Sequence, residues 1–256
     1  DSREERDQLV VLWDFQSLNL EPDNIAVEWY WMLEYLKKLR PEVDNNLVLR
    51  AYIGWQQHWT VREPLRQLGF DVIQAQQDSD RQIIRDIEQM FGMPSQNQGW
   101  IVRIGNNQQP VFSPEDTTVL LIANDGEYTE LLGRLDEVDA ELFLWSDDDC
   151  SERLTNAINP EHVISWELPY VACTALNVIR EIEGKPIPRT EFANRCESKF
   201  EDSGYEIYPA DAGFSSKRPY RSLLRYLTNS GLVSVRRVGR NSGKVRILLN
   251  QQREDS

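Results

Sequence analysis

The sequence predicts an α/β fold: a parallel sheet flanked by helices, followed by a small α+β domain. Apolar runs of strand length alternate with segments of helical periodicity through residues 1–167. The segments between these runs are long enough for the crossover helices that parallel strands require. From residue 168 to 256 the pattern changes to three helical segments followed by one alternating segment, which predicts a second domain.

The elements of the first domain can be assigned in order along the chain. The run QLVVLWDF at 8–15 is apolar up to Asp14, as is typical of a strand buried on both faces. The other expected strands lie at 46–55, 70–75, 118–123, 140–146 and 162–166. The expected helices lie at 25–40, 60–69, 79–92, 127–135 and 151–158. Ser79 is a typical N-cap residue, and Gly69 and Gly92 stand where C-cap glycines belong. We expect a peripheral hairpin or extended loop at 98–112.

The second domain has its own order of elements. Helices are expected at 170–183, 188–201 and 217–231, the last of them ending at Gly231. Residues 232–249 alternate between polar and apolar around the turn sequence GRNSG, which predicts a β-hairpin. Three helices followed by a hairpin are the layout of a winged-helix domain.

The composition narrows the class of protein. The three cysteines, Cys150, Cys173 and Cys196, are odd in number and far apart, which disfavours a disulfide framework and zinc-finger spacing. This usage fits a reducing compartment, and we expect a cytoplasmic protein. The longest apolar runs are strand-sized, so we expect no membrane span. The sequence opens with DSREERDQLV, without Met or an apolar signal region, and we expect a chain trimmed at this end.

Charge is distributed unevenly along the chain. The net charge is −14, yet residues 217–246 hold nine basic residues and no acidic one. Without these nine, 19 basic residues face 42 acidic ones, a net charge of −23 for the rest of the chain. An acidic body with a basic end suggests two different tasks.

Acidic residues follow several of the predicted strands. Asp14 ends the first strand, Asp125 and Glu127 follow the strand at 118–123, and Asp78 and Asp80 follow the strand at 70–75. In α/β sheets ligands bind beyond the carboxyl ends of the strands, so we expect these acids to converge there.

Clustered carboxylates point to a divalent metal ion. They repel one another at neutral pH unless a cation compensates them, and oxygen ligands without His or Cys favour Mg²⁺ or Mn²⁺. Such ions assist phosphodiester hydrolysis. The alternative is that Asp80 and Asp125 only cap helices, since Asp is a favoured residue at helix starts. A separate run, Asp147 to Asp149, is either a second metal patch or a solvated loop.

Three stretches resemble the motifs of NYN domains, a PIN-like group of metal-dependent ribonucleases. They are VLWDFQSLN, DSDRQIIRDI and VLLIANDGEYTELL, within a region of resemblance at 8–167. The family places an Asp at the end of the first strand with Asn three residues later. It has a further Asp opening a helix, with another six residues on, and ends on an S-G-D-x-D-F or S-N-D-type turn. The matching positions here are Asp14, Asp80, Asp86, Asp125, Glu127 and Tyr128.

The resemblance implies a role for each of these positions. Asp14, Asp80 and Asp125 are expected to bind the metal ion, and Glu127 to act as a ligand or water-orienting base. Supporting roles are expected for Ser17, Asn124 and Asp86. Ser17 stands where the family has Asn, and Glu127 stands where it has Asp. Asp86 lies about 240° around an ideal helix from Asp80, so both cannot point into one site.

The basic end of the chain predicts a nucleic-acid interface. The candidate residues are Lys217, Arg218, Arg221, Arg225, Arg236, Arg237, Arg240, Lys244 and Arg246. A basic helix followed by a basic hairpin suits a phosphate backbone. The alternative is a solvated face that pairs with the acidic body. The layout also resembles the LOTUS-type winged-helix modules that are often fused to NYN domains.

Together these observations predict a metal-dependent endoribonuclease that cleaves single-stranded RNA, with Mg²⁺ or Mn²⁺ as cofactor. The winged-helix end would capture the RNA, and DNA is a second candidate substrate. One alternative is a PIN-like protein with weak catalysis that recruits RNA, DNA or another protein. A scaffold whose acidic face binds a partner protein is a third hypothesis.

Overall fold

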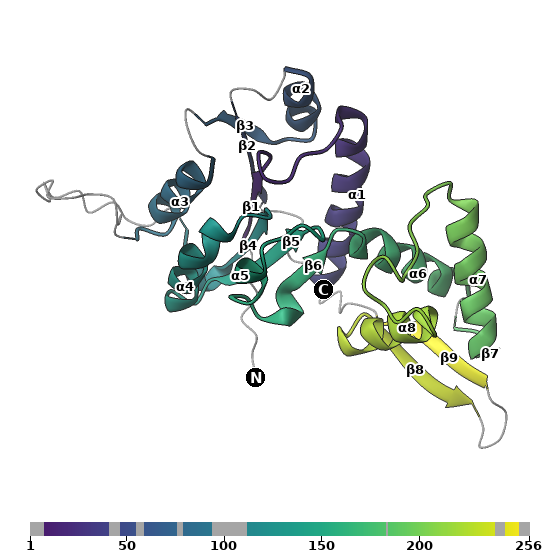
Figure 1. The fold of residues 1–256 in the computed structure, drawn as a ribbon. Helices are drawn as coiled ribbons and strands as arrows, with labels where there is room; N and C mark the ends of the chain where they lie inside the picture. Colours follow the sequence, from purple (N-terminus) through teal and green to yellow (C-terminus); the bar gives the residue numbers. More distant parts are fainter. Residues whose placement is uncertain are drawn as a thin grey trace, which may run out of the picture. The chain divides into compact units, whose positions relative to one another are not determined.

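The computed structural model describes residues 8–40, 47–54, 59–75, 79–93, 112–182, 184–238 and 244–250. The chain divides into two compact units (Figure 1). The first comprises Asp1–Val27 and Glu42–Ile164, and the second comprises Glu28–Pro41 and Ser165–Ser256. The long helix α1 (Pro22–Leu39) therefore begins in the first unit and continues in the second.

The first unit is built on a six-stranded sheet with the order β3-β2-β1-β4-β5-β6. The strands are β1 (Gln8–Asp14), β2 (Leu47–Ile53), β3 (Asp71–Gln74), β4 (Thr117–Ile122), β5 (Glu141–Ser146) and β6 (Val163–Ser165). The strand pairs β1–β2, β1–β4, β2–β3 and β4–β5 are all parallel. The predicted α/β fold with a parallel sheet flanked by helices is thus confirmed. The expected loop at 98–112 lies, apart from its last residue, outside the described residues.

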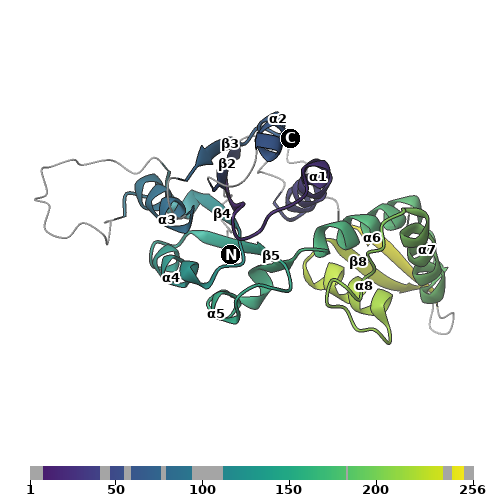
Figure 2. The ribbon, with the colours of Figure 1, turned by 45° about the horizontal axis from the view of Figure 1, so that its top comes forward.

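The central strands β1 and β4 are buried along their whole length, which explains their continuous apolar sequences. One face of the sheet packs against α3 (Ser79–Met90) and α4 (Thr129–Glu137) through residues such as Leu12, Ile83 and Leu131. The other face carries Trp13, whose ring lies 5.8 Å from that of Phe70, just after α2 (Trp59–Gln67). Figure 2 shows these helices on opposite sides of the sheet.

Short elements connect the later strands of this unit. They are the 3-10 helices η2 (Pro114–Asp116), η3 (Gly126–Tyr128) and η4 (Pro160–His162), and the one-turn helix α5 (Glu152–Thr155). The helix expected at 127–135 therefore starts as a 3-10 turn and becomes α-helical at Thr129. Gly69 and Gly92 follow α2 and α3 with φ of 90° and 64°, as the predicted C-caps require.

The second unit contains α6 (Leu168–Ile182), α7 (Arg189–Asp202), α8 (Pro219–Asn229) and a small antiparallel sheet. Its strands β7 (Ile187–Pro188), β8 (Val233–Val238) and β9 (Lys244–Leu249) have the order β7-β9-β8. The core includes Leu223, Leu227 and Ile247, each 0% exposed. Part of α1 joins this core, because Trp31 packs edge-on against Tyr170 and the Tyr35 and Tyr226 hydroxyls are hydrogen-bonded.

Among the described residues, no helix combines the length and apolarity needed to cross a membrane.

Candidate metal centre at the carboxyl edge of the sheet

The chain builds one half of the sheet outward from β1 to β3 and the other half outward from β4 to β6. The topological switch point therefore lies between β1 and β4. Ligands of open α/β sheets bind in the crevice outside the carboxyl ends of the strands at this switch point. Asp14 is the last residue of β1, and Asp125 follows β4 by three positions. The two acids therefore end the two strands that flank the switch point.

Asp14 is a buried carboxylate, 2% exposed, and both of its oxygens accept hydrogen bonds. Oδ1 accepts from the Ser79 hydroxyl at 2.6 Å and from the Gln16 backbone N–H at 3.1 Å. Oδ2 accepts from the Tyr128 hydroxyl at 2.7 Å. These three donors come from α3, from the turn after β1 and from η3, so the orientation of Asp14 is fixed from three sides.

The buried Tyr128 hydroxyl donates to Asp14 and is influenced by the charges of the other two predicted metal ligands. Its side chain is 0% exposed, and burial is the main reason why its pKa is raised well above the usual value for tyrosine. The negative charges of Asp14, Asp80 and Asp125 raise the pKa further. The structure thus brings these three acids, from three separate segments, within electrostatic range of one hydroxyl.

Asp80 and Asp125 keep acceptor positions to which no described residue donates. Asp80 lies in the first turn of α3, is 8% exposed, and accepts no hydrogen bond among the described residues. Asp125 is exposed, and its Oδ1 accepts from the Glu127 backbone N–H at 3.0 Å, so it caps η3. Capping engages only this one oxygen, which leaves Oδ2 of Asp125 for a ligand.

Glu127 is the fourth predicted catalytic residue. Its side chain is exposed, and it follows Asp125 by two residues in the same turn. Gly126 between them packs so closely against α5 that an added Cβ would lie 2.6 Å from the Ser151 hydroxyl oxygen. This contact fixes the turn that carries Asp125, Glu127 and Tyr128. Asp78, the other acid near α3, lies outside the described residues.

The predicted supporting residues Ser17 and Asn124 connect strand ends. The Ser17 hydroxyl donates to the Asp14 carbonyl at 3.4 Å and accepts from the Asn124 backbone N–H at 3.2 Å. The Asn124 side chain donates to Asp147 Oδ1 at 2.8 Å and accepts from the Asp147 N–H at 3.2 Å. Ser17 and Asn124 thus fix the spacing of β1, β4 and β5. Asp147 also accepts from the Asp149 N–H, as in an ordinary turn.

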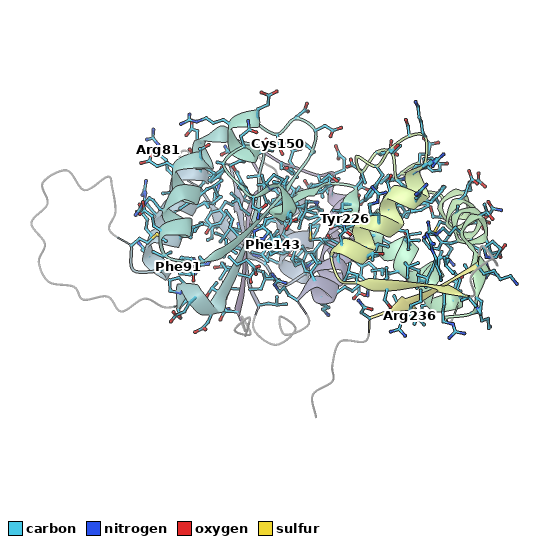
Figure 3. All side chains as sticks on the ribbon, turned by 90° about the horizontal axis from the view of Figure 1, so that it is seen from below. Arg81, Phe91, Phe143, Cys150, Tyr226 and Arg236 are labelled. Carbon is cyan, nitrogen blue, oxygen red and sulfur yellow. The ribbon has the colours of Figure 1, made fainter. Side chains whose placement is uncertain are left out.

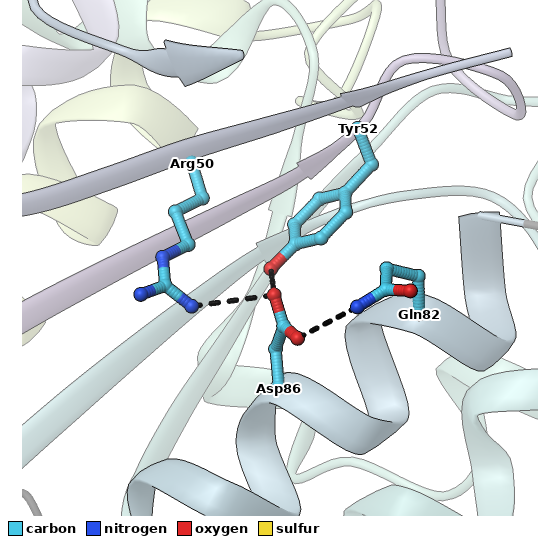
Figure 4. Close-up of polar contacts among 4 residues, drawn as sticks. All are labelled: Arg50, Tyr52, Gln82 and Asp86. Carbon is cyan, nitrogen blue, oxygen red and sulfur yellow. Dashed lines mark hydrogen bonds and ion pairs between the residues drawn. The ribbon is translucent and has the colours of Figure 1, made fainter. Parts of the chain in front are cut away.

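Asp86, the third predicted supporting residue, belongs to a different polar cluster (Figure 4). Its Oδ2 accepts from the Tyr52 hydroxyl at 2.7 Å and pairs with Arg50 at 3.2 Å, and its Oδ1 accepts from Gln82 at 2.9 Å. Burial first, and then the charge of Asp86, raise the pKa of Tyr52, whereas the Arg50 charge lowers it. Asp86 is therefore compensated by an arginine of β2.

The acids around Tyr128 have no such compensating ion pair within the described part of the chain. Among the described residues, no Lys or Arg forms an ion pair with Asp14, Asp80 or Asp125. No group of three His, Cys, Asp or Glu side chains in the described part of the chain is arranged to hold an ion. The donor chemistry nevertheless fits Mg²⁺ or Mn²⁺, because the candidate ligands are carboxylate oxygens without His or Cys.

The predicted nucleic-acid residues of the second unit are exposed wherever the structure describes them. These residues are Lys217, Arg218, Arg221, Arg225, Arg236, Arg237, Lys244 and Arg246, and Arg240 lies outside the described residues. Arg236 of β8 (Figure 3) is directly opposite Arg246 of β9. Like charges in such a cross-strand pair destabilise a hairpin, so this pair favours an anionic ligand.

The sequence interpretation gave no site role to Gln16, Arg50 or Tyr52, and treated Ser79 only as a helix cap. Gln16 Oε1 lies 2.7 Å from the Ser79 hydroxyl oxygen, so Gln16 and Asp14 are alternative acceptors for the one proton of this hydroxyl. Arg50 and Tyr52 stand two positions apart on β2, and residues so spaced lie on one face of a strand. From that spacing one could have predicted that Arg50 and Tyr52 contact the same residue, which is Asp86.

Comparisons with known proteins assign no family. Neither models of protein families nor curated proteins give a match to this sequence. Among solved structures, a protein of unknown function from Vibrio parahaemolyticus is similar, with a TM-score of 0.41 and 14% sequence identity. The likeness covers 63% of this chain and 94% of that one. At this TM-score it supports no conclusion about fold family or function.

Proposed function

We propose that the chain is a metal-dependent endoribonuclease of the NYN type, with its active site at the carboxyl edge of β1 and β4. The observation that carries the proposal is the group of Asp14, Asp80 and Asp125 around Tyr128, which no cation of the described residues compensates. Buried or clustered charges are costly unless they are paired or bind a metal ion. A divalent cation is the partner that this oxygen donor set favours.

Asp14, Asp80 and Asp125 would hold the ion. When bound, Mg²⁺ or Mn²⁺ supplies charge neutralisation at the scissile phosphate and lowers the pKa of a water molecule. Asp14 is held in one orientation by its three donors, so it presents a fixed ligand position. The exposed Glu127 carboxylate would orient a water molecule and accept its proton.

The second unit supports capture of a phosphate backbone. Its elements follow the order α6-β7-α7-α8-β8-β9, which agrees with a winged-helix arrangement in which α8 and the β8–β9 hairpin face the nucleic acid. Arg221 and Arg225 are exposed on α8, while Leu223 and Leu227 of the same helix are buried. The basic residues are thus presented to solvent where a phosphate backbone can reach them.

The test is Mn²⁺-dependent cleavage of labelled single-stranded RNA by the wild type, Asp125→Asn and Asp116→Asn. Asp116 is a matched control, because it is an exposed acid at the opposite, amino end of the same strand β4. We expect Asp125→Asn to lower the cleavage rate by on the order of 100-fold or more, since even outer-shell changes at metal sites cost 10–100-fold. Asp116→Asn should cleave like the wild type. Equal cleavage by all three proteins would remove this site from the proposal.

The second candidate is a binding module of the same fold with weak catalysis. Ser17 favours it, because its hydroxyl already bonds both the Asp14 carbonyl and the Asn124 N–H and stands where the family has Asn. This candidate predicts no cleavage but retained RNA binding. Arg236→Ala and Arg246→Ala would then each reduce the salt slope of RNA binding by about one.

A further inference from the structure

We propose that Tyr128 is the positioning residue of the metal centre, because its hydroxyl holds Asp14 Oδ2 and leaves that oxygen a second acceptor position for the ion. This inference rests on the metal site of the proposed function. It goes beyond the resemblance to NYN domains, in which the corresponding turn position is Phe and has no hydroxyl.

The Asp14 carboxylate has a limited number of acceptor positions. A carboxylate has about four lone-pair positions, two on each oxygen. Oδ1 accepts from the Gln16 N–H, and it shares the single proton of the Ser79 hydroxyl with Gln16 Oε1. Among the described residues, Oδ2 accepts from the Tyr128 hydroxyl alone. A second acceptor position of Asp14 is therefore open on Oδ2, the same oxygen that Tyr128 holds.

Tyr128 is buried in the core. Its side chain is 0% exposed, and its ring packs in the core formed by β1, β4, α3 and α4. A hydroxyl held by such a ring has little freedom to move, whereas a carboxylate alone rotates about its terminal bond. Because the Tyr128 ring is fixed in the core, its hydrogen bond keeps Asp14 Oδ2 in one orientation.

The turn η3 connects two of the proposed ligands, Asp14 and Asp125. Tyr128 ends η3, and Asp125 caps the start of the same 3-10 turn. One short turn therefore exposes the Asp125 carboxylate to solvent and, through the buried Tyr128 hydroxyl, binds the Asp14 carboxylate. The close packing of Gly126 on Ser151 fixes this turn. Carboxylates that bind metals are generally held by further hydrogen bonds, and losing one such partner costs 10–100-fold in metal affinity.

The test compares Tyr128→Phe with Tyr52→Phe in the full chain. Tyr52 is the matched control, since it is also 0% exposed and also donates to a buried aspartate, Asp86, at 2.7 Å. Each variant removes one oxygen and one hydrogen bond and keeps the ring. The readout is Mn²⁺ binding measured by the electron paramagnetic resonance signal of free Mn²⁺, which is independent of catalysis.

We expect Tyr128→Phe to bind Mn²⁺ about 10–100-fold more weakly than the wild type, and Tyr52→Phe to bind it like the wild type. Both variants should unfold at a lower temperature, so loss of stability alone cannot explain a difference in Mn²⁺ affinity. Equal Mn²⁺ affinity in Tyr128→Phe and the wild type would overturn the positioning role and leave the metal site standing. A wild type that binds no Mn²⁺ would overturn both proposals.

Discussion

Two buried aspartates of this protein accept the same hydrogen bond from a buried tyrosine and differ in what surrounds them. Tyr128 donates to Asp14 and Tyr52 donates to Asp86, each at 2.7 Å. Asp86 also has the Arg50 guanidinium at 3.2 Å. The other charges that act on Tyr128 are those of Asp80 and Asp125, which are acids as well.

The difference separates a structural carboxylate from a candidate ligand. Around Asp86 the negative charge has its cation within the chain, and Gln82 occupies the second carboxylate oxygen. Such a cluster holds β2 to α3 and needs nothing from outside. Around Asp14 the neighbouring charges are negative as well, and no described residue donates to Asp80 or to Oδ2 of Asp125. A cation from solution is the simplest way to stabilise that arrangement.

The largest effect on stability is expected at the compensated site. Asp86→Asn removes the ion pair with Arg50 while Tyr52 keeps its place, and we expect a loss of about 1–3 kcal/mol in the free energy of unfolding. Denaturant unfolding, with Asp116→Asn as an exposed control, measures this loss. An unfolding free energy equal to that of the control would show that Asp86 is not the structural member of the comparison.

A smaller effect on stability is expected at Glu28 of the second unit, whose carboxylate lies near that of Glu167. Burial first, and then the charge of Glu167, raise the pKa of Glu28 to about 6. Because the folded protein binds this proton more tightly than the unfolded chain, stability should rise as pH falls from 7 through 6 towards 4.5.

Glu28→Gln should therefore stabilise the protein at pH 7 and lose this advantage near pH 4.5. Glu28 is partly exposed, so solvent screening limits the gain to less than about 1 kcal/mol. Thermal unfolding across this pH range measures the effect. A gain that is the same at both ends of the range would contradict the assignment of Glu28 as the responsible group.

Much of the sheet could be predicted because local pattern and burial agree. The apolar runs that end in Asp14 and precede Asp125 are buried on both faces, and this left one interpretation of each. The two-residue strand β7 was not predicted, because two residues carry no periodicity. The division of α1 between the units was not predicted either, since a continuous amphipathic pattern does not show which core each turn joins.

In the candidate site, too, the local sequence pattern predicts some features, whereas others depend on tertiary packing. Strand ends locate Asp14 and Asp125, because parallel strands share one carboxyl edge. The sequence does not show that the Tyr128 hydroxyl reaches Asp14, since that depends on how η3 packs. It also does not show that the Ser17 hydroxyl is engaged by Asp14 and Asn124, which come from different strands.

The most direct test of the central claim is the response of unfolding to Mn²⁺ in the wild type, Asp14→Asn and Asp86→Asn. A ligand at 100 times its dissociation constant stabilises a folded protein by about 2.7 kcal/mol. We predict that Mn²⁺ stabilises the wild type and Asp86→Asn by the same increment, whatever their starting stabilities, and does not stabilise Asp14→Asn. Equal stabilisation of Asp14→Asn, or none of the wild type, would contradict the assignment of the uncompensated acids as a metal centre.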